Sequence, residues 1–225
     1  MSETATVSPD QLVATVRGEL QDTERAIRSH RFLDLLDRGE VPEERLREFA
    51  GEQHAIVSSD RRSFAQLAAR FPAPPAGDFF LGMAQGEGEA LGRLLGFAAW
   101  LGLDDEELRA HDPRPGGQAY PAFVAWLALN GSRADVLLAF LANLAAWGEN
   151  CGRVAEALRA RYRAGAEAVS FFQFFASPPP DFERRALAVL AAGLGEGESP
   201  ERARHATRLL QAYELFFWDA MVEGL

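Results

Sequence analysis

The sequence contains no lysine, and all 23 of its basic residues are arginine. Without lysine the chain cannot form a Schiff base with a carbonyl substrate or supply the lysine of a phosphate-binding loop. Its single cysteine, Cys151, cannot form an internal disulfide, which favours a reducing compartment. No apolar run approaches the roughly 18–20 residues that span a bilayer. The first ten residues also lack the basic and apolar regions of a secretory signal. We therefore expect a cytoplasmic protein that does not enter a membrane.

Acidic residues outnumber basic ones, 33 to 23, and the formal net charge is -10 at pH 7. Basic residues gather no further than the pairs Arg61-Arg62 and Arg184-Arg185. Because affinity for a phosphate backbone depends on local positive charge, we expect no nucleic-acid partner. The glycine-rich segment 82–92 contains no GxGxxG motif and follows no apolar strand, so it does not predict a dinucleotide-binding loop.

Helical patterns run through most of the chain, and no segment alternates as a strand would. The sequence predicts long helices over 42–70, 78–101 and 181–194, joined by short loops. Ser8, followed by Pro9, is typical of a helix N-terminus. We predict one all-α domain spanning residues 1–225, with about eight helices and with residues 1–8 disordered.

A carboxylate interrupts the apolar stretch LLQAYELFFWDAM near the C-terminus. At helical spacing, Glu214 shares one stripe with Leu210, Phe217 and Met221, where a core residue is expected. A carboxylate in that position needs a hydrogen-bonding or cationic partner, or its pKa rises until it holds a proton. Glu214 is therefore a candidate acid or base.

Three polar or aromatic residues follow one another on a second predicted helix. Asn143, Trp147 and Cys151 stand at i, i+4 and i+8, on one helical face. Cys151 is a candidate nucleophile, although buried cysteine usually only packs. A buried asparagine must find hydrogen-bond partners, so Asn143 is a candidate ligand contact.

Aromatic residues gather in the segment FFQFF and beside Tyr120, which follows a glycine-rich loop. These rings, Phe175 among them, could form ordinary core or line a pocket for a flat heterocycle. The four histidines lack metal-ligand spacing, and Gly92 stands where a Glu-x-x-His motif would need histidine. We expect no metal and no haem or other cofactor.

Four stretches, in order, resemble the TenA family, the thiaminase II-like group of the haem-oxygenase-like fold. The family opens with His-Pro-Phe, a turn and Phe-Tyr-x-x-Gln-Asp, which is similar to HRFLDLLDRGEVPEERLREFAGEQ. Its tyrosine-containing and nucleophile helices are similar to QAYPAFVAWLALNGSRADVLLAFLANLAAWGENCG. Its Trp-Ile-x-x-Tyr-Ala-Ser stretch is similar to FFQFFAS, and its closing motif to YELFFWDAM. The resemblance covers most of the chain from His30 onward and implies a haem-oxygenase-like helical bundle.

The resemblance also implies a small-molecule site. Members of the family act on aminopyrimidines derived from thiamin breakdown: a cysteine thiolate adds to the ring, and a C-terminal glutamate handles the exocyclic amine and protons. Glu214 matches that glutamate, Tyr120 matches a pocket tyrosine, and Phe217 matches a phenylalanine that contacts the ring.

The chain departs from this pattern at four positions. Asn143 replaces the nucleophilic cysteine, Trp147 replaces a tyrosine, Gln53 replaces the pyrimidine-binding aspartate, and Phe175 replaces a second tyrosine. Asparagine has no accessible anionic form, which excludes covalent addition at that position. Cys151 lies roughly 12 Å further along the helix, at about 1.5 Å per residue, and would need a shifted ligand.

The leading hypothesis is a divergent TenA-like protein that binds a small amine-bearing, aminopyrimidine-like heterocycle in an enclosed pocket. Hydrolysis would use water as the nucleophile and Glu214 as acid and base. One alternative is a metal-dependent or cofactor-free oxidase of the same fold. The other is a non-catalytic ligand-binding or regulatory module that acts through protein partners. Because relatives of this fold often form tetramers, we expect a homo-oligomer, either a dimer or a tetramer.

Overall fold

The computed structural model describes residues 8–225, and this part of the chain is helical throughout, without strands. The first seven residues of the segment predicted to be disordered lie outside the described residues. The helices are α1 Pro9–Glu19, α2 Gln21–Arg28, α3 Arg31–Arg38, α4 Glu43–Arg70, α5 Ala76–Trp100, α6 Asp105–Ala110, α7 Pro115–Asn130, α8 Arg133–Tyr162, α9 Ala166–Ala176, α10 Phe182–Gly195 and α11 Pro200–Val222.

The prediction of an all-α bundle is confirmed, and the described residues form eleven helices where about eight were expected. The three long predicted helices correspond to α4, α5 and α10 within two residues at each end. Several of the eleven are short: α2 and α3 have eight residues each, and α6 has six. A break of regular backbone at Leu20 separates α1 from α2, although the apolar pattern continues through it.

Two local signals set helix ends in the first part of the chain, and the sequence predicts the one at Ser8. The Ser8 side chain accepts a hydrogen bond from the backbone N–H of Gln11 (3.2 Å) and so caps α1. Gly39 ends α3 in the left-handed region (φ 72°), a conformation that glycine adopts without steric cost. The chain can then turn back into α4.

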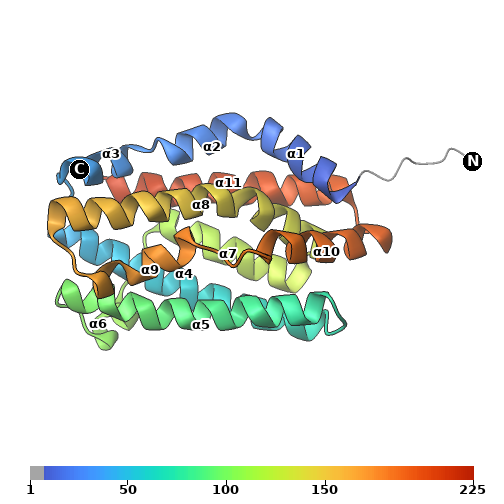
Figure 1. Ribbon diagram of the computed structural model, residues 1–225, viewed down its shortest axis with the longest axis horizontal. Helices are drawn as coiled ribbons and strands as arrows, with labels where there is room; N and C mark the ends of the chain where they lie inside the picture. Colours follow the sequence, from blue (N-terminus) through green and yellow to red (C-terminus); the bar gives the residue numbers. More distant parts are fainter. Residues whose placement is uncertain (1–7) are drawn as a thin grey trace, which may run out of the picture.

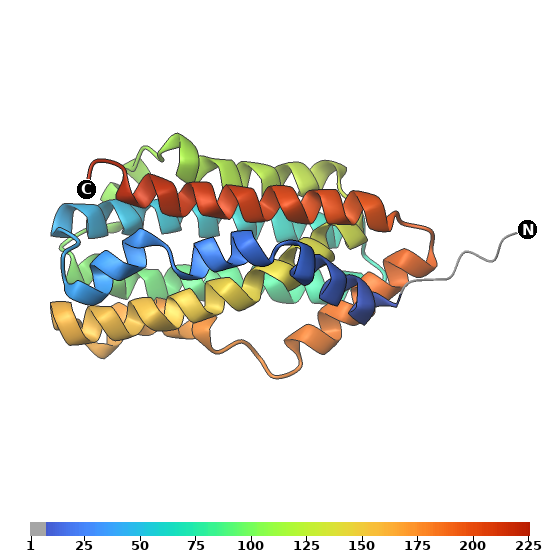
Figure 2. The ribbon, with the colours of Figure 1, turned by 90° about the horizontal axis from the view of Figure 1, so that it is seen from above.

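The long helices lie side by side along one axis, and the N-terminal helices α1, α2 and α3 run along the outside of α8 and α11 (Figure 1, Figure 2). On the opposite side, α5 packs against α4 and α9. Within the described residues, no helix combines the length and the apolarity needed to cross a membrane.

Two apolar clusters divide the interior of the bundle. One contains Phe49, Phe97, Phe172 and Trp218, and it lies toward the end at which α3 meets the C-terminus. The other contains Phe64 among its buried residues and lies toward α1 and α10. The site described below occupies the region in which the two clusters meet.

A glycine permits the close approach of α5 to α9. A Cβ atom added at Gly96 would lie 2.7 Å from the backbone oxygen of Glu167 on α9, whereas one added at Gly92 would meet nothing within 4 Å. We expect Gly96→Ala to lower the free energy of unfolding by about 1–3 kcal/mol, because the helices must separate. The matched change Gly92→Ala should raise it by about 0.5–1 kcal/mol through helix propensity. Urea unfolding of both variants checks this, and equal effects would contradict it.

Candidate functional site

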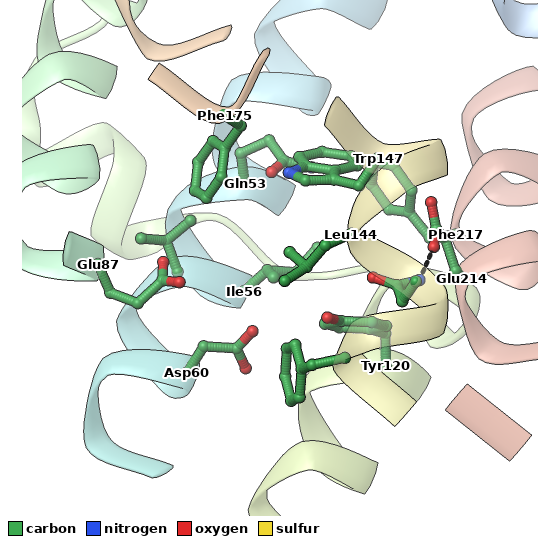
Figure 3. A pocket seen from close by; sticks show the side chains of 13 residues that line it. Gln53, Ile56, Asp60, Glu87, Tyr120, Leu144, Trp147, Phe175, Glu214 and Phe217 are labelled. Atoms are coloured by element: carbon green, nitrogen blue, oxygen red, sulfur yellow. Dashed lines mark hydrogen bonds between the residues drawn. The ribbon is translucent and has the colours of Figure 1, made fainter. Parts of the chain in front are cut away.

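A cavity lies inside the bundle, between α4, α5, α7, α8, α9 and α11 (Figure 3). Its volume is about 60 Å³. It is lined by Gln53, Ile56, Val57, Asp60, Glu87, Tyr120, Phe140, Asn143, Leu144, Trp147, Phe175, Glu214 and Phe217.

A second, larger cavity of about 480 Å³ adjoins the first one. Glu87, Phe140, Leu144 and Phe175 line both cavities and therefore form the wall between them. The outer cavity is bordered by mostly apolar residues and by the segment 178–180, which consists of three prolines. The two cavities therefore lie directly against each other, with these four side chains between them.

Glu214 is held in the inner cavity by two donors and is only 3% exposed. The Asn143 amide donates to its Oε2 atom, and the Trp218 indole N–H donates to its Oε1 atom at 3.3 Å. Burial raises the pKa of Glu214 to about 7, while the hydrogen bonds from Trp218 and Asn143 lower it. Its carboxyl group can therefore exist in both protonation states near neutral pH, as a general acid or base requires.

Helix geometry explains how α11 presents this carboxyl group. Leu210, Glu214, Phe217 and Met221 are all buried, as the predicted stripe requires. Trp218, one turn after Glu214, is also buried and reaches the same carboxylate. The apolar neighbours fix the rotation of the helix, and that rotation carries Glu214 into the cavity.

A buried carboxylate outside the cavity supports the start of α7. Glu52 accepts a hydrogen bond from the Arg114 backbone N–H (2.7 Å), and its Oε1 atom lies 3.3 Å from His111 Nε2. These contacts hold the segment that leads into α7, one turn before Tyr120 enters the cavity wall. We infer that Glu52 and His111 position this helix.

The structure brings together six of the residues that the sequence singles out beside Glu214. All six border the inner cavity, although they come from five helices; they are Gln53, Tyr120, Asn143, Trp147, Phe175 and Phe217. Their role as ligand contacts stays a prediction. The aromatic segment on α9 contributes both to the core and to the pocket. Phe171 and Phe172 are core residues, whereas Phe175 lines the inner cavity.

Cys151 is not among the residues that line either cavity. It is buried in the apolar cluster that also contains Trp218 and Val154. Burial, and then the charge of Glu214, raises the pKa of the Cys151 thiol well above its usual value, which disfavours the nucleophilic thiolate. Its position and its chemistry are those of a packing residue, and we do not retain it as a candidate nucleophile.

The cavity contains two further carboxyl groups, Asp60 and Glu87, which the sequence patterns did not predict. Asp60 stands seven residues after Gln53, two helical turns along the same face of α4, and this spacing is the signal that could have revealed it. Glu87 lies in the glycine-rich segment, whose pattern does not show which residue faces inward. Burial raises the pKa of both groups well above their usual values, and the charge of Asp60 raises that of Glu87 further.

Two buried polar atoms in the cavity lack a hydrogen-bond partner. They are the Nε2 atom of Gln53 and the Oδ1 atom of Asp60, on residues that are 1% and 5% exposed. Buried polar groups are normally hydrogen-bonded, so these atoms are available to a ligand or to bound water. Burial, followed by the charge of Asp60, also raises the pKa of Tyr120, which therefore remains a neutral hydroxyl.

No group of three or more histidine, cysteine or acidic side chains is arranged to hold a metal ion among residues 8–225. His30 uses both ring nitrogens locally: Nδ1 accepts from the Phe32 backbone N–H at 3.2 Å, and Nε2 lies 3.1 Å from Asp219 Oδ1. His30 therefore joins the start of α3 to α11.

Several solved structures of other proteins share this arrangement of helices. The TenA homologue from P. horikoshii OT3 is 18% identical, with a TM-score of 0.76 over 95% of this chain and 99% of that chain. The TenA homologue from Pseudomonas syringae is 15% identical, with a TM-score of 0.77 over 93% and 92%. Heme oxygenase-1 from the cyanobacterium Synechocystis is 13% identical, with a TM-score of 0.67 over 94% and 92%. No curated protein matches the sequence.

These overlaps show that the chain has the haem-oxygenase-like fold, here with a cavity that contains buried polar groups between two apolar clusters. The model of the TENA/THI-4/PQQC family matches residues 18–224, nearly the whole length of the sequence. The chain belongs to this family, and the resemblance noted from its motifs is confirmed.

Proposed function

We propose that the protein binds a small, flat, amine-bearing heterocycle of the aminopyrimidine type in the inner cavity. The observation that carries this proposal is Glu214, a buried carboxyl group that titrates near neutral pH in a cavity bordered by aromatic rings. A carboxyl group and an amide side by side can accept from and donate to the amine and ring nitrogen of such a compound. The rings of Trp147, Phe175 and Phe217 supply apolar surface for its faces.

We propose further that the protein hydrolyses this ligand without a covalent intermediate. Asn143 occupies the position that the TenA resemblance gives to the nucleophile, and its amide cannot attack. A water molecule would form the new C–O bond while the C–N bond breaks. Glu214 would accept a proton from the water and donate one to the departing nitrogen, so that ammonia leaves and an alcohol remains.

Thermal unfolding with and without 4-amino-5-aminomethyl-2-methylpyrimidine tests the binding. Ligand at about 100 times its Kd contributes roughly 2.7 kcal/mol to the stability of the native state. At about 2–4 °C per kcal/mol for a chain of this size, Tm should rise by several degrees. Glu214→Gln should lose most of this rise, whereas Glu156→Gln, the same change at an exposed site on α8, should keep it. An equal ligand-induced rise in Tm for the natural protein and both variants would show that Glu214 does not contribute to binding.

Product analysis of the same mixtures separates an enzyme from a binding module. Release of ammonia that depends on Glu214 supports hydrolysis. Binding without any product would favour the non-catalytic ligand-binding alternative.

We also propose that the protein forms a homo-oligomer, either a dimer or a tetramer. An aromatic patch on α7 and α11 supports this: Trp126 and Phe216 are about half exposed, and Phe123 packs against both Trp126 and Tyr213. Exposed apolar patches of this kind commonly mark interfaces. Sedimentation equilibrium should give a multiple of the chain mass, and a monomer at micromolar concentration would contradict the proposal.

A further inference from the structure

The outer cavity has no role in the proposed function, which uses the inner cavity alone. Its volume of about 480 Å³ lies within the range of small-molecule pockets, roughly 300–1,000 Å³. Side chains from α1, α5, α8, α9 and α10 border it. The segment 178–180 completes the border, and Figure 2 shows that this connection between α9 and α10 bows away from the long helices. The outer cavity is therefore large enough to hold a molecule of its own.

Most of the outer cavity wall is apolar. Phe79, Phe140 and Phe182 contribute aromatic rings, and the ring centroids of Phe79 and Phe182 lie 5.3 Å apart. The three prolines at 178–180 have no backbone N–H group, so this part of the wall holds no backbone donor that needs a partner. Such a wall favours an occupant with an apolar body, and aromatic rings pack well against other rings.

Two glycines on α5 keep the outer cavity wide. Gly82 and Gly86 stand one helical turn apart, and both border the cavity. A Cβ atom added at Gly82 would lie 3.7 Å from Arg185 Nη2, and one added at Gly86 would lie 3.9 Å from Phe174 Cζ. Helix packing therefore does not require glycine at either position, although glycine is less stable than alanine inside a helix. What the two glycines provide is space in the cavity.

Two arginines border the same cavity. The Arg17 Nη2 atom donates to the Leu141 carbonyl oxygen at 2.7 Å and lies 3.4 Å from Glu183 Oε1, whereas its Nε atom is buried without a partner. The guanidinium carbon of Arg185 lies 5.7 Å from the ring centroid of Phe79. Within residues 8–225 Arg185 forms no ion pair, unlike Arg17.

The charges of this lining leave one positive charge without compensation. Glu183 offsets Arg17. Burial raises the pKa of Glu87, the other carboxyl group on the border, well above its usual value, and the charge of Asp60 raises it further. Glu87 is therefore held in its neutral form, and the charge of Arg185 remains. An acidic group on the occupant complements it.

We infer that the outer cavity is a second binding site, for an organic anion with an aromatic body. The rings of this ligand lie among the apolar side chains, and its acidic group pairs with Arg185. The Nε–H group of Arg17 is a further donor on the same border. The site is separate from the heterocycle site, so the inference goes beyond the proposed function and does not rest on it.

Two fluorescent probes that share one ring system test the inference. They are 8-anilinonaphthalene-1-sulfonate, an anion, and N-phenyl-1-naphthylamine, which lacks the sulfonate group and is neutral. Fluorescence titration gives the Kd of each probe for the natural protein and for each variant. We expect both probes to bind, because both carry the apolar body. The role of charge is measured by how a variant changes each Kd, since the two probes differ in solubility.

Two arginine variants test the pairing with the acidic group. Arg185→Gln should raise the Kd of the sulfonate at least about threefold, as the loss of an exposed ion pair allows, and should leave that of the neutral probe unchanged. Arg184→Gln is the matched control, because Arg184 is the neighbouring residue on α10, pairs with Asp181 and does not border the cavity. It should leave both Kd values unchanged.

Two glycine variants test whether the probes lie in the outer cavity. Gly86→Leu adds a side chain on the cavity border and should weaken both probes at least about tenfold. Gly92→Leu makes the same change on the exposed face of α5, where an added Cβ meets nothing within 4 Å, and should leave both unchanged. Helical circular dichroism and Tm show whether each variant is folded. If Gly86→Leu does not fold, the arginine pair still decides the outcome.

The results that would overturn the inference are specific. They are the absence of binding by either probe, an unchanged sulfonate Kd in Arg185→Gln, an equal weakening of the sulfonate in Arg184→Gln, or full binding by folded Gly86→Leu. A loss that is confined to the sulfonate in Arg185→Gln, together with a loss of both probes in Gly86→Leu, supports it.

Discussion

Replacement of Glu214 by glutamine should reduce turnover of the aminopyrimidine by at least about 100-fold, the usual contribution of a general acid or base. Glutamine keeps the shape and can accept a hydrogen bond from Asn143 or from Trp218 through its single amide oxygen, but it cannot exchange a proton. Because the pKa of Glu214 is about 7, the protonated form is lost as the pH rises through that value. If protonation of the departing amine limits the rate, turnover of the natural protein should fall above about pH 7 by tenfold per unit. Steady-state kinetics from pH 5 to 9 measures this.

The free energy of unfolding of Glu214→Gln, measured at two pH values, is the control for this prediction. A carboxyl group whose pKa is about 4.5 in the unfolded chain and about 7 in the native state binds more protons when folded. Its favourable contribution is complete below about pH 4.5 and is lost as the pH rises to about 7, a change of up to about 3 kcal/mol. Glu214→Gln lacks this loss, so relative to the natural protein it should be more stable at pH 8 than at pH 5. An inactive variant that is instead unfolded at pH 8 would contradict the assigned role.

Trp218→Ala should cost about 3–5 kcal/mol in the free energy of unfolding, a large part of the 5–15 kcal/mol that typical domains possess. The indole is fully buried, and its centroid lies 5.9 Å from that of Phe32, 6.2 Å from that of Phe49 and 5.0 Å from that of Phe217. Removal of the ring opens a cavity that three aromatic neighbours cannot close. Urea unfolding of the purified variant measures the loss.

Trp218→Phe separates packing from hydrogen bonding. It keeps most of the apolar volume but removes the N–H group that donates to Glu214. We expect a loss of stability clearly smaller than that of the alanine variant. The pKa of Glu214 should rise further, because one donor to the ionised carboxylate is gone. Equal losses in the two variants would show that the contribution of Trp218 is not mainly its packed volume.

Local patterns in the sequence define most of the helices and one face of the site. Apolar residues at a spacing of three and four define helices whatever their neighbours are, and Ser8 and Gly39 mark ends through backbone chemistry that is local. Glu214 was recognisable because a carboxylate in an apolar stripe is expensive unless something binds it. Asn143 was recognisable for the same reason.

Which of these residues meet depends on how the helices pack against one another. Cys151 shares a helical face with Asn143, yet α8 carries it beyond the cavity and into the core. Asp60 and Glu87 lie on different helices, and their inward orientation depends on how α4 and α5 are rotated against each other. That rotation follows from the packing of many apolar side chains at once, so it cannot be read from the spacing of residues along either helix.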